Sequence, residues 1–112
     1  MEEEFSCKPV EVSDEFKANR THIYDYSIDT FGYLQAERYM QKIEVALSTL
    51  HNSYTIYSEC HHLPTKSRRY RNIILDAHLI IYRITDLRIE VLDIVHKASS
   101  IKKIRNVRKI LF

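Results

Sequence analysis

Two histidines and several arginine and lysine residues in the second half of the chain are the groups that could carry out chemistry. His78 and His96 lie near the ends of the stretch "HLIIYRITDLRIEVLDIVHK", residues 78–97. An imidazole exchanges protons near neutral pH, and nearby cations can stabilise negative charge that develops in a reaction. A site of this kind would draw on Arg71, His78, Arg83, His96 and Lys97.

The spacing of these residues limits how they could act together. Successive side chains of a strand point to opposite faces, and the positions of His78 and Arg83 differ by an odd number. A site that used both would therefore need a bulge in the strand. His96 also has a structural interpretation, in which it closes a strand and hydrogen-bonds to nearby backbone.

The segment "ECHH" at Glu59–His62 raises the question of a metal site. Cys60, His61 and His62 are adjacent, and neighbouring side chains of a strand cannot all converge on one ion. Zinc sites use three or four ligands that are usually spaced further apart, and His51 would add only one. We therefore expect no metal site.

The single glycine, Gly32, excludes the motifs that bind phosphates through the backbone. A phosphate-binding loop or a dinucleotide fingerprint needs several glycines, and the GxSxG motif of hydrolases is absent as well. We expect no cofactor. Cys7 and Cys60 have no CxxC spacing, and in a chain without a signal peptide they are expected to be reduced thiols of a cytoplasmic protein.

Length and charge predict one domain over residues 1–112, with a core at about 8–97 and a basic C-terminal element at 98–112. No apolar run approaches the roughly 20 residues that cross a bilayer, so we expect no membrane contact. The formal net charge is only +2, but basic residues cluster in two runs. Such clusters suit a polyanionic partner or an acidic protein surface, although many are only solvated. The residues expected to bind a target or partner are Arg68, Arg69, Lys102, Lys103, Arg105 and Arg108.

The first half of the chain predicts a strand and a helical hairpin. A β-favouring run spans Phe5–Val12, and Ser13 is a suitable N-cap for a helix that Gly32 would end. A second helix follows at once, so the two must fold back on each other. Its apolar stripe is clean, whereas that of the first helix is only partly apolar. The stripes are Phe16, Asn19, Ile23, Tyr26 and Thr30, and then Ala36, Met40, Ile43, Leu47 and Leu50.

The second half predicts an antiparallel sheet. Residues 51–65 have no clear pattern and are predicted to form a loop with one short extended piece. Three β-favouring runs follow at Tyr70–Leu75, Leu79–Thr85 and Ile89–Val95, and their short connections force antiparallel pairing. In the last two runs, most residues that would point to either face of the strand are apolar, which predicts central strands. The basic segment after residue 97 has apolar residues at helical spacing, which indicates a helix or a tail that contacts a partner or a second copy of the chain.

This α+β order resembles the RelE/ParE superfamily of type II toxins. Three stretches carry the resemblance: residues 23–50, "IYDYSIDTFGYLQAERYMQKIEVALSTL", residues 79–84, "LIIYRI", and residues 89–97, "IEVLDIVHK". The resemblance implies a toxin, of the kind found in plasmid stabilisation, that a cognate antitoxin wraps and neutralises. It also implies that the antitoxin contributes a helical segment to an apolar groove beside the sheet.

Two activities share this scaffold, so the fold alone does not decide between them. RelE-like members cut mRNA on the ribosome, and ParE-like members inhibit DNA gyrase by protein contacts without known chemistry. Leu79 stands where a RelE-like nuclease would carry arginine, and no tyrosine follows Tyr82. These absences, together with the Tyr-rich first helix, favour the ParE branch and a protein that is not an enzyme. The alternatives are an mRNA endonuclease and an inactive antitoxin-binding module.

Overall fold

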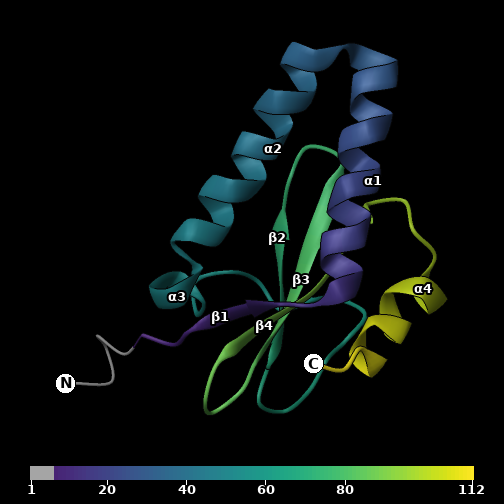
Figure 1. Cartoon of the computed structure of the whole chain (residues 1–112). Coiled ribbons are helices and arrows are strands. Elements are labelled where there is room, and N and C mark those ends of the chain that lie inside the picture. The colour runs from purple at the N-terminus through teal and green to yellow at the C-terminus, as the bar shows by residue number, and fades with distance from the viewer. Residues whose placement is uncertain (1–6) are drawn as a thin grey trace.

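A four-stranded sheet with helices on both faces forms the frame of the protein (Figure 1). The computed structural model describes residues 7–112. The strand order is β1-β4-β3-β2, with β1 parallel to β4 and the other neighbours antiparallel. In chain order the elements are β1 (Val10–Val12), α1 (Asp14–Phe31), α2 (Tyr33–Ser48), α3 (Leu50–Ser53), β2 (Tyr70–Ile74), β3 (His78–Ile84), β4 (Ile89–His96), α4 (Ile101–Asn106) and the 3-10 helix η2 (Val107–Lys109).

The predicted element order is confirmed, with differences at the ends of elements. Of the strand predicted over Phe5–Val12, the structure has only Val10–Val12, and residues 5 and 6 lie outside the described part of the chain. The segment predicted as a loop begins with the short helix α3. Its extended piece is a single bridge between Glu59 and Arg71.

Local signals set the bounds of the helical hairpin. The Ser13 hydroxyl accepts a hydrogen bond from the Phe16 amide at 2.9 Å, as an N-cap does, and donates to the Leu92 carbonyl at 2.5 Å. Gly32 lies between α1 and α2 with φ +92° and ψ 164°, a conformation that is open almost only to glycine. Farther along the hairpin, the Tyr24 hydroxyl donates to the Glu37 carboxylate, which raises the pKa of Tyr24 to about 12.

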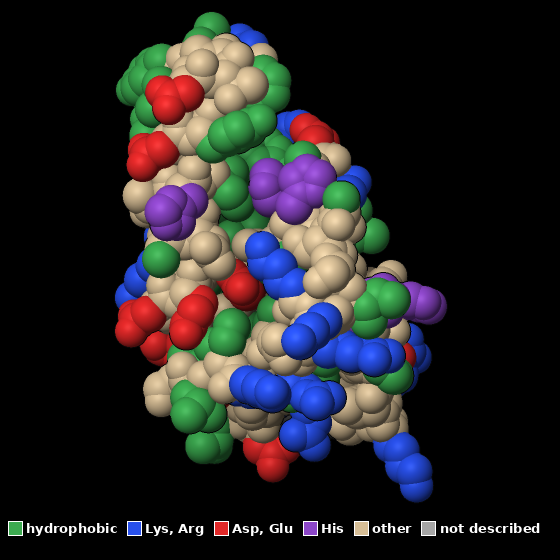
Figure 2. All heavy atoms as spheres, turned by 90° about the vertical axis from the view of Figure 1, so that its right-hand side faces the viewer, with side chains coloured by type: hydrophobic (Ala, Val, Ile, Leu, Met, Phe, Trp, Pro, Cys, Tyr) green, Lys and Arg blue, Asp and Glu red, His purple; other side chains and the backbone are tan. Residues whose placement is uncertain are grey.

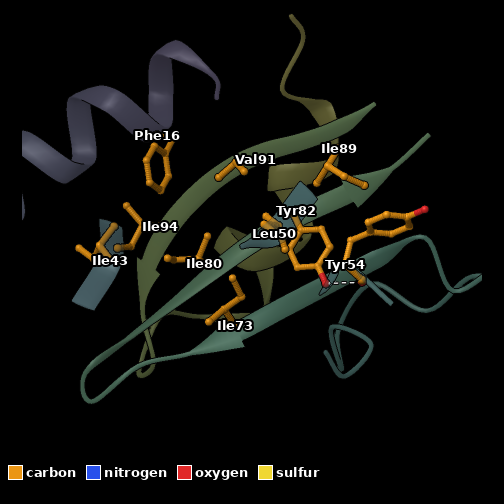
Figure 3. Close-up of a cluster of buried hydrophobic side chains, with 10 residues drawn as sticks. All are labelled: Phe16, Ile43, Leu50, Tyr54, Ile73, Ile80, Tyr82, Ile89, Val91 and Ile94. Carbon is orange, nitrogen blue, oxygen red and sulfur yellow. Dashed lines mark hydrogen bonds between the residues drawn. The ribbon is translucent and has the colours of Figure 1, made fainter. Parts of the chain in front are cut away.

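The main core lies between the sheet and the hairpin (Figure 3). Phe16 and Ile43 are fully buried against the strands, and the Tyr82 hydroxyl donates to the Tyr54 carbonyl at 2.6 Å. The stripe predicted for α2 is confirmed as a buried or half-buried face. The stripe predicted for α1 is wrong at Tyr26, whose side chain is 65% exposed, and at Thr30, which is exposed as well.

A second core fills the opposite face of the sheet. There α4 and η2 pack Ile104 and Val107 against Ile81, Leu92 and Val95 of the central strands. The C-terminal segment is thus a helix that covers its own sheet. Its Ile104 and Val107 side chains are buried within the chain. The expectation that the apolar side of this segment contacts a partner is therefore wrong for these two residues.

β4 contains one extra residue relative to its neighbour β3. Ile81 of β3 pairs with Asp93, but Tyr82 pairs with Val91, which leaves Leu92 as an insertion. The buried Asp93 carboxylate accepts hydrogen bonds from the Asn19 side chain at 2.7 Å and from the Ile94 amide at 2.8 Å. Burial raises the pKa of Asp93 despite these bonds.

None of the helices in residues 7–112 is both long and apolar enough to span a bilayer.

Candidate functional site

The five residues that could serve a nuclease do not all lie at one site. His78 and His96 are paired across β3 and β4 at one end of the sheet. Arg83 is on the other face of β3, as the odd spacing predicts, and the insertion in β4 leaves that alternation unchanged. The structure therefore brings the two histidines together and keeps both arginines away from them.

Arg83 is bound within its own fold. Its guanidinium lies 2.7 Å from the Glu90 carboxylate, and it also donates to the Tyr70 hydroxyl at 3.4 Å. Two further bonds reach the Arg108 and Ile110 carbonyls at 3.3 and 3.4 Å. These contacts fasten the C-terminal segment to the sheet.

Arg71 is bound in a similar way. Its guanidinium donates to the carbonyls of Thr55, Tyr57 and Arg68 at 2.8 to 3.0 Å, which holds the long loop before β2 against the strand edge. Lys97 is exposed just beyond β4, and its backbone amide donates to the Ala77 carbonyl at 2.9 Å.

The histidine pair forms a small polar cluster with Tyr39. The Tyr39 hydroxyl and His78 Nδ1 lie 2.8 Å apart, and the rings of His78 and His96 meet edge to face with centroids 5.4 Å apart. His96 Nδ1 accepts the Ala98 amide at 3.0 Å, which is the backbone contact that the sequence predicts. Burial, together with the charge of His96, lowers the pKa of His78.

This lowered pKa predicts that the protein loses stability in mild acid. A histidine with a folded pKa below its unfolded value of 6.5 contributes stability above that value, which is lost as pH falls through the folded pKa. We expect the free energy of unfolding to decrease as the pH is lowered below about 6.5. His78→Gln should flatten this dependence. Denaturant titrations between about pH 5 and 7.5 measure it, and an unchanged slope in the variant would contradict the assignment.

A groove opens between the helical hairpin and the end of the sheet that carries the histidines. We call it the hairpin groove; its volume is about 870 Å³. Apolar side chains form much of its wall, and Tyr26 and Phe31 are 65% and 57% exposed there. Lys42 and Asp76 pair at its rim at 2.7 Å. Figure 2 shows hydrophobic side chains beside histidines in a hollow on this side of the molecule. The residues that line the groove include Ile23, Tyr26, Phe31, Tyr39, His78 and His96.

The residues expected to bind a target or partner form a second surface. We call it the basic face: Arg68, Arg69, Lys102, Lys103, Arg105 and Arg108, all exposed. Figure 2 shows lysine and arginine side chains gathered over the lower half of the same view. Arg68 has a positive φ of 54° and lies 3.8 Å from Glu59, in a loop that Thr65 braces by accepting the Arg69 amide at 3.2 Å.

Of the Cys60–His62 segment, Cys60 is part of the second core, whereas His61 is exposed and His62 is half-buried. Cys60 is buried, and burial raises the pKa of its thiol. The His61 and His62 rings contact each other with centroids 4.8 Å apart. Within residues 7–112, no three His, Cys, Asp or Glu side chains are grouped so that they could hold a metal ion.

Sequence reasoning missed Tyr39 and Phe31 as groove residues and Lys109 as a further exposed cation beside the basic face. Tyr39 lies next to the apolar stripe of α2, and Phe31 directly precedes Gly32 at the end of the helix. An aromatic residue at such an exposed helix end is the signal that could have indicated a binding surface.

Known proteins resemble this chain in both sequence and fold. The sequence model of the family described as "ParE toxin of type II toxin-antitoxin system, parDE" matches residues 10–101. A solved structure described as "Chromosomal ParDE TA system from P. aeruginosa" is similar with a TM-score of 0.66. The similarity covers 81% of this chain and 97% of that chain, at 17% identity, and at this identity it shows a likeness of fold. No curated protein sequence matches the chain significantly. The family match ends at the first residue of α4.

Proposed function

Because the chain belongs to the ParE toxin family of type II toxin–antitoxin systems, we propose that it inhibits DNA gyrase through protein contacts and is neutralised by a cognate antitoxin. The helical hairpin presents the contacts with the gyrase protein, and the basic C-terminal segment adds a contact with gyrase where it holds DNA. The proposal assigns no covalent chemistry to the toxin itself.

The observation that supports this proposal most is the separation of the nuclease candidates. Cleavage of RNA at a 2′-hydroxyl needs a base, an acid and a cation at one reacting phosphate. Here Arg83 and His78 lie on opposite faces of β3, and the guanidiniums of Arg83 and Arg71 are bonded to groups of their own fold. The histidines have Tyr39 beside them, and neither Arg71 nor Arg83 lies with them.

The hairpin groove is the proposed site of the antitoxin. Its volume of about 870 Å³ and its apolar wall suit one face of an amphipathic helix, and its exposed aromatic rings are ones that a partner could cover. Bound there, an antitoxin would cover the hairpin and so block one of the surfaces that contact the target.

A gyrase assay tests the proposal. The purified chain is expected to inhibit supercoiling of relaxed plasmid and to accumulate gyrase-linked DNA breaks, and stoichiometric antitoxin should restore activity. His96→Gln should inhibit as well as the parent does, because the histidine has no catalytic task in this mechanism.

Two other results would overturn it. Unaffected supercoiling with no DNA breaks would refute gyrase as the target. Cleavage of mRNA on stalled ribosomes that His96→Gln abolishes would establish the endonuclease instead. Arg83→Ala is a poorer probe of that activity, since this side chain also holds the C-terminal segment to the sheet.

A further inference from the structure

The positive charge of the basic face is largely unpaired. Among residues 7–112, no ion pair involves Lys102, Lys103, Arg105 or Arg108. Of the carboxylates near this face, Glu59 lies near Arg68, and Glu90 pairs with Arg83 and Arg88. The buried Asp93 lines a pocket with Lys102 and Lys103, and the charge of Lys103 acts on it. The remaining cations therefore produce a positive potential that an anionic surface would neutralise.

Two chain segments contribute to one continuous surface. Leu63 of the loop that leads to Arg68 packs in the same core cluster as Ile104 of α4. Arg83 joins the two segments, because its guanidinium donates both to the Tyr70 hydroxyl and to the Arg108 carbonyl. Burial of Ile104 and Val107 fixes the outward direction of the cations on α4 and η2. The charges are thus held in place before any partner arrives.

We propose that the basic face binds the phosphate backbone of duplex DNA without reading its base sequence. This inference rests on the proposed function, since a toxin that acts on gyrase meets its target on duplex DNA. Lysine and arginine contacts with phosphates position a protein but carry no sequence information. Most of α4 and all of η2 lie beyond the part of the chain that matches the family, whereas Arg68 and Arg69 lie within it.

The composition of the face favours duplex DNA over the other polyanions. Single-stranded nucleic acid is bound by aromatic side chains that stack on bases. The two aromatic residues beside the basic face, Tyr70 and Phe112, each have an arginine over one side of the ring, Arg83 and Arg88 respectively, where a base would have to stack. Protein interfaces are centred on buried aromatic or aliphatic anchors and are depleted in lysine. The exposed aliphatic side chains of the C-terminal segment, Ile101 and Leu111, stand near its two ends, and the cations between them fit a regular line of phosphates.

Direct binding to a fluorescently labelled 30-base-pair duplex tests the inference with the chain alone. Anisotropy titrations should show binding that weakens about 40- to 500-fold between about 50 and 200 mM salt, as three to five phosphate contacts imply. Lys102→Glu should weaken binding about fivefold or more and make the salt dependence shallower. Arg105→Glu should act in the same direction.

Lys17→Glu is the matched control. Lys17 is also an exposed helical lysine and the charge change is equal, but it lies on α1, across the sheet from α4. The affinity of the Lys17→Glu variant for the duplex should stay close to that of the parent. Equal losses from Lys17→Glu and Lys102→Glu, or no binding at about 50 mM salt, would overturn the inference. Tighter binding to single-stranded DNA or duplex RNA would overturn it as well.

The outcome is independent of the gyrase result. A chain that inhibits gyrase but does not bind DNA refutes this inference and leaves the proposed function intact. A chain that binds duplex DNA and leaves supercoiling untouched refutes the proposed function instead. Lys102-dependent binding to gyrase without DNA would assign the face to a protein partner and overturn the inference.

Discussion

Glu90→Gln is expected to destabilise the protein by about 2 kcal/mol and to loosen the C-terminal segment. The Glu90 carboxylate is 8% exposed and lies 2.7 Å from Arg83 and 2.8 Å from Arg88. Without its charge, the Arg83 guanidinium keeps a positive charge at 16% exposure with only neutral partners. The expected loss is below the 3–5 kcal/mol of a fully buried pair, because Arg88 is 39% exposed and remains hydrated.

The pH dependence identifies the cause of this loss. Burial alone would raise the pKa of Glu90, but the hydrogen bonds from Arg83 and Arg88 outweigh it and hold the pKa below the ordinary 4.5. Stability from a lowered carboxyl pKa is present above the unfolded value and is lost as pH falls through the folded one. The difference between parent and variant should therefore shrink only below about pH 4.5.

Denaturant unfolding measures the energy, and amide hydrogen exchange over residues 107–110 measures the release of the segment. Glu44→Gln is the control, since Glu44 is an exposed carboxylate on α2 and the same change there should cost little. Equal stability of Glu90→Gln and the parent at neutral pH would show that the pair contributes nothing net.

Removing the two exposed rings of the hairpin groove is expected to weaken antitoxin binding about 30-fold or more, which is about 2 kcal/mol. The variant is Tyr26→Ala/Phe31→Ala. Aromatic side chains of this size commonly carry much of the energy of an interface, and these two are largely open to solvent in the free toxin. Both lie on α1, and alanine keeps its helical conformation.

Titration calorimetry with the purified antitoxin gives the affinity. Ile56→Ala/Leu87→Ala is the matched control, because these side chains are 76% and 83% exposed and are not among the residues that line the groove. The control should bind as the parent does. A parent-like affinity for the groove variant would place the antitoxin elsewhere on the toxin.

The helices and strands could be predicted from the sequence because the signals that set them lie within short segments. The Ser13 cap and the stripe of α2 depend on residues within a few positions of each other. The continuous apolar runs of β3 and β4 indicated central strands. Such strands need apolar packing on each face of the sheet. That the C-terminal segment supplies the packing on the second face depends on long-range contacts, which local patterns do not indicate.

The candidate site was harder to predict because it depends on register. Arg83 was interpreted as a nuclease cation, although a hairpin between residues 84 and 89 places it opposite Glu90, where it forms an ion pair. The same register without the insertion in β4 would put Val95 opposite His78. One extra residue therefore creates the histidine pair, and no short-range pattern signals where a strand inserts it.

The parallel pairing of β1 with β4 has a consequence for how the toxin is made. Val10 lies beside Ile89, so the first strand has no place in the sheet until nearly the whole chain has left the ribosome. The hairpin is synthesised early but keeps its apolar face uncovered until β3 and β4 follow. Contacts of such long sequence separation slow folding. The nascent chain thus stays incompletely folded during most of its translation.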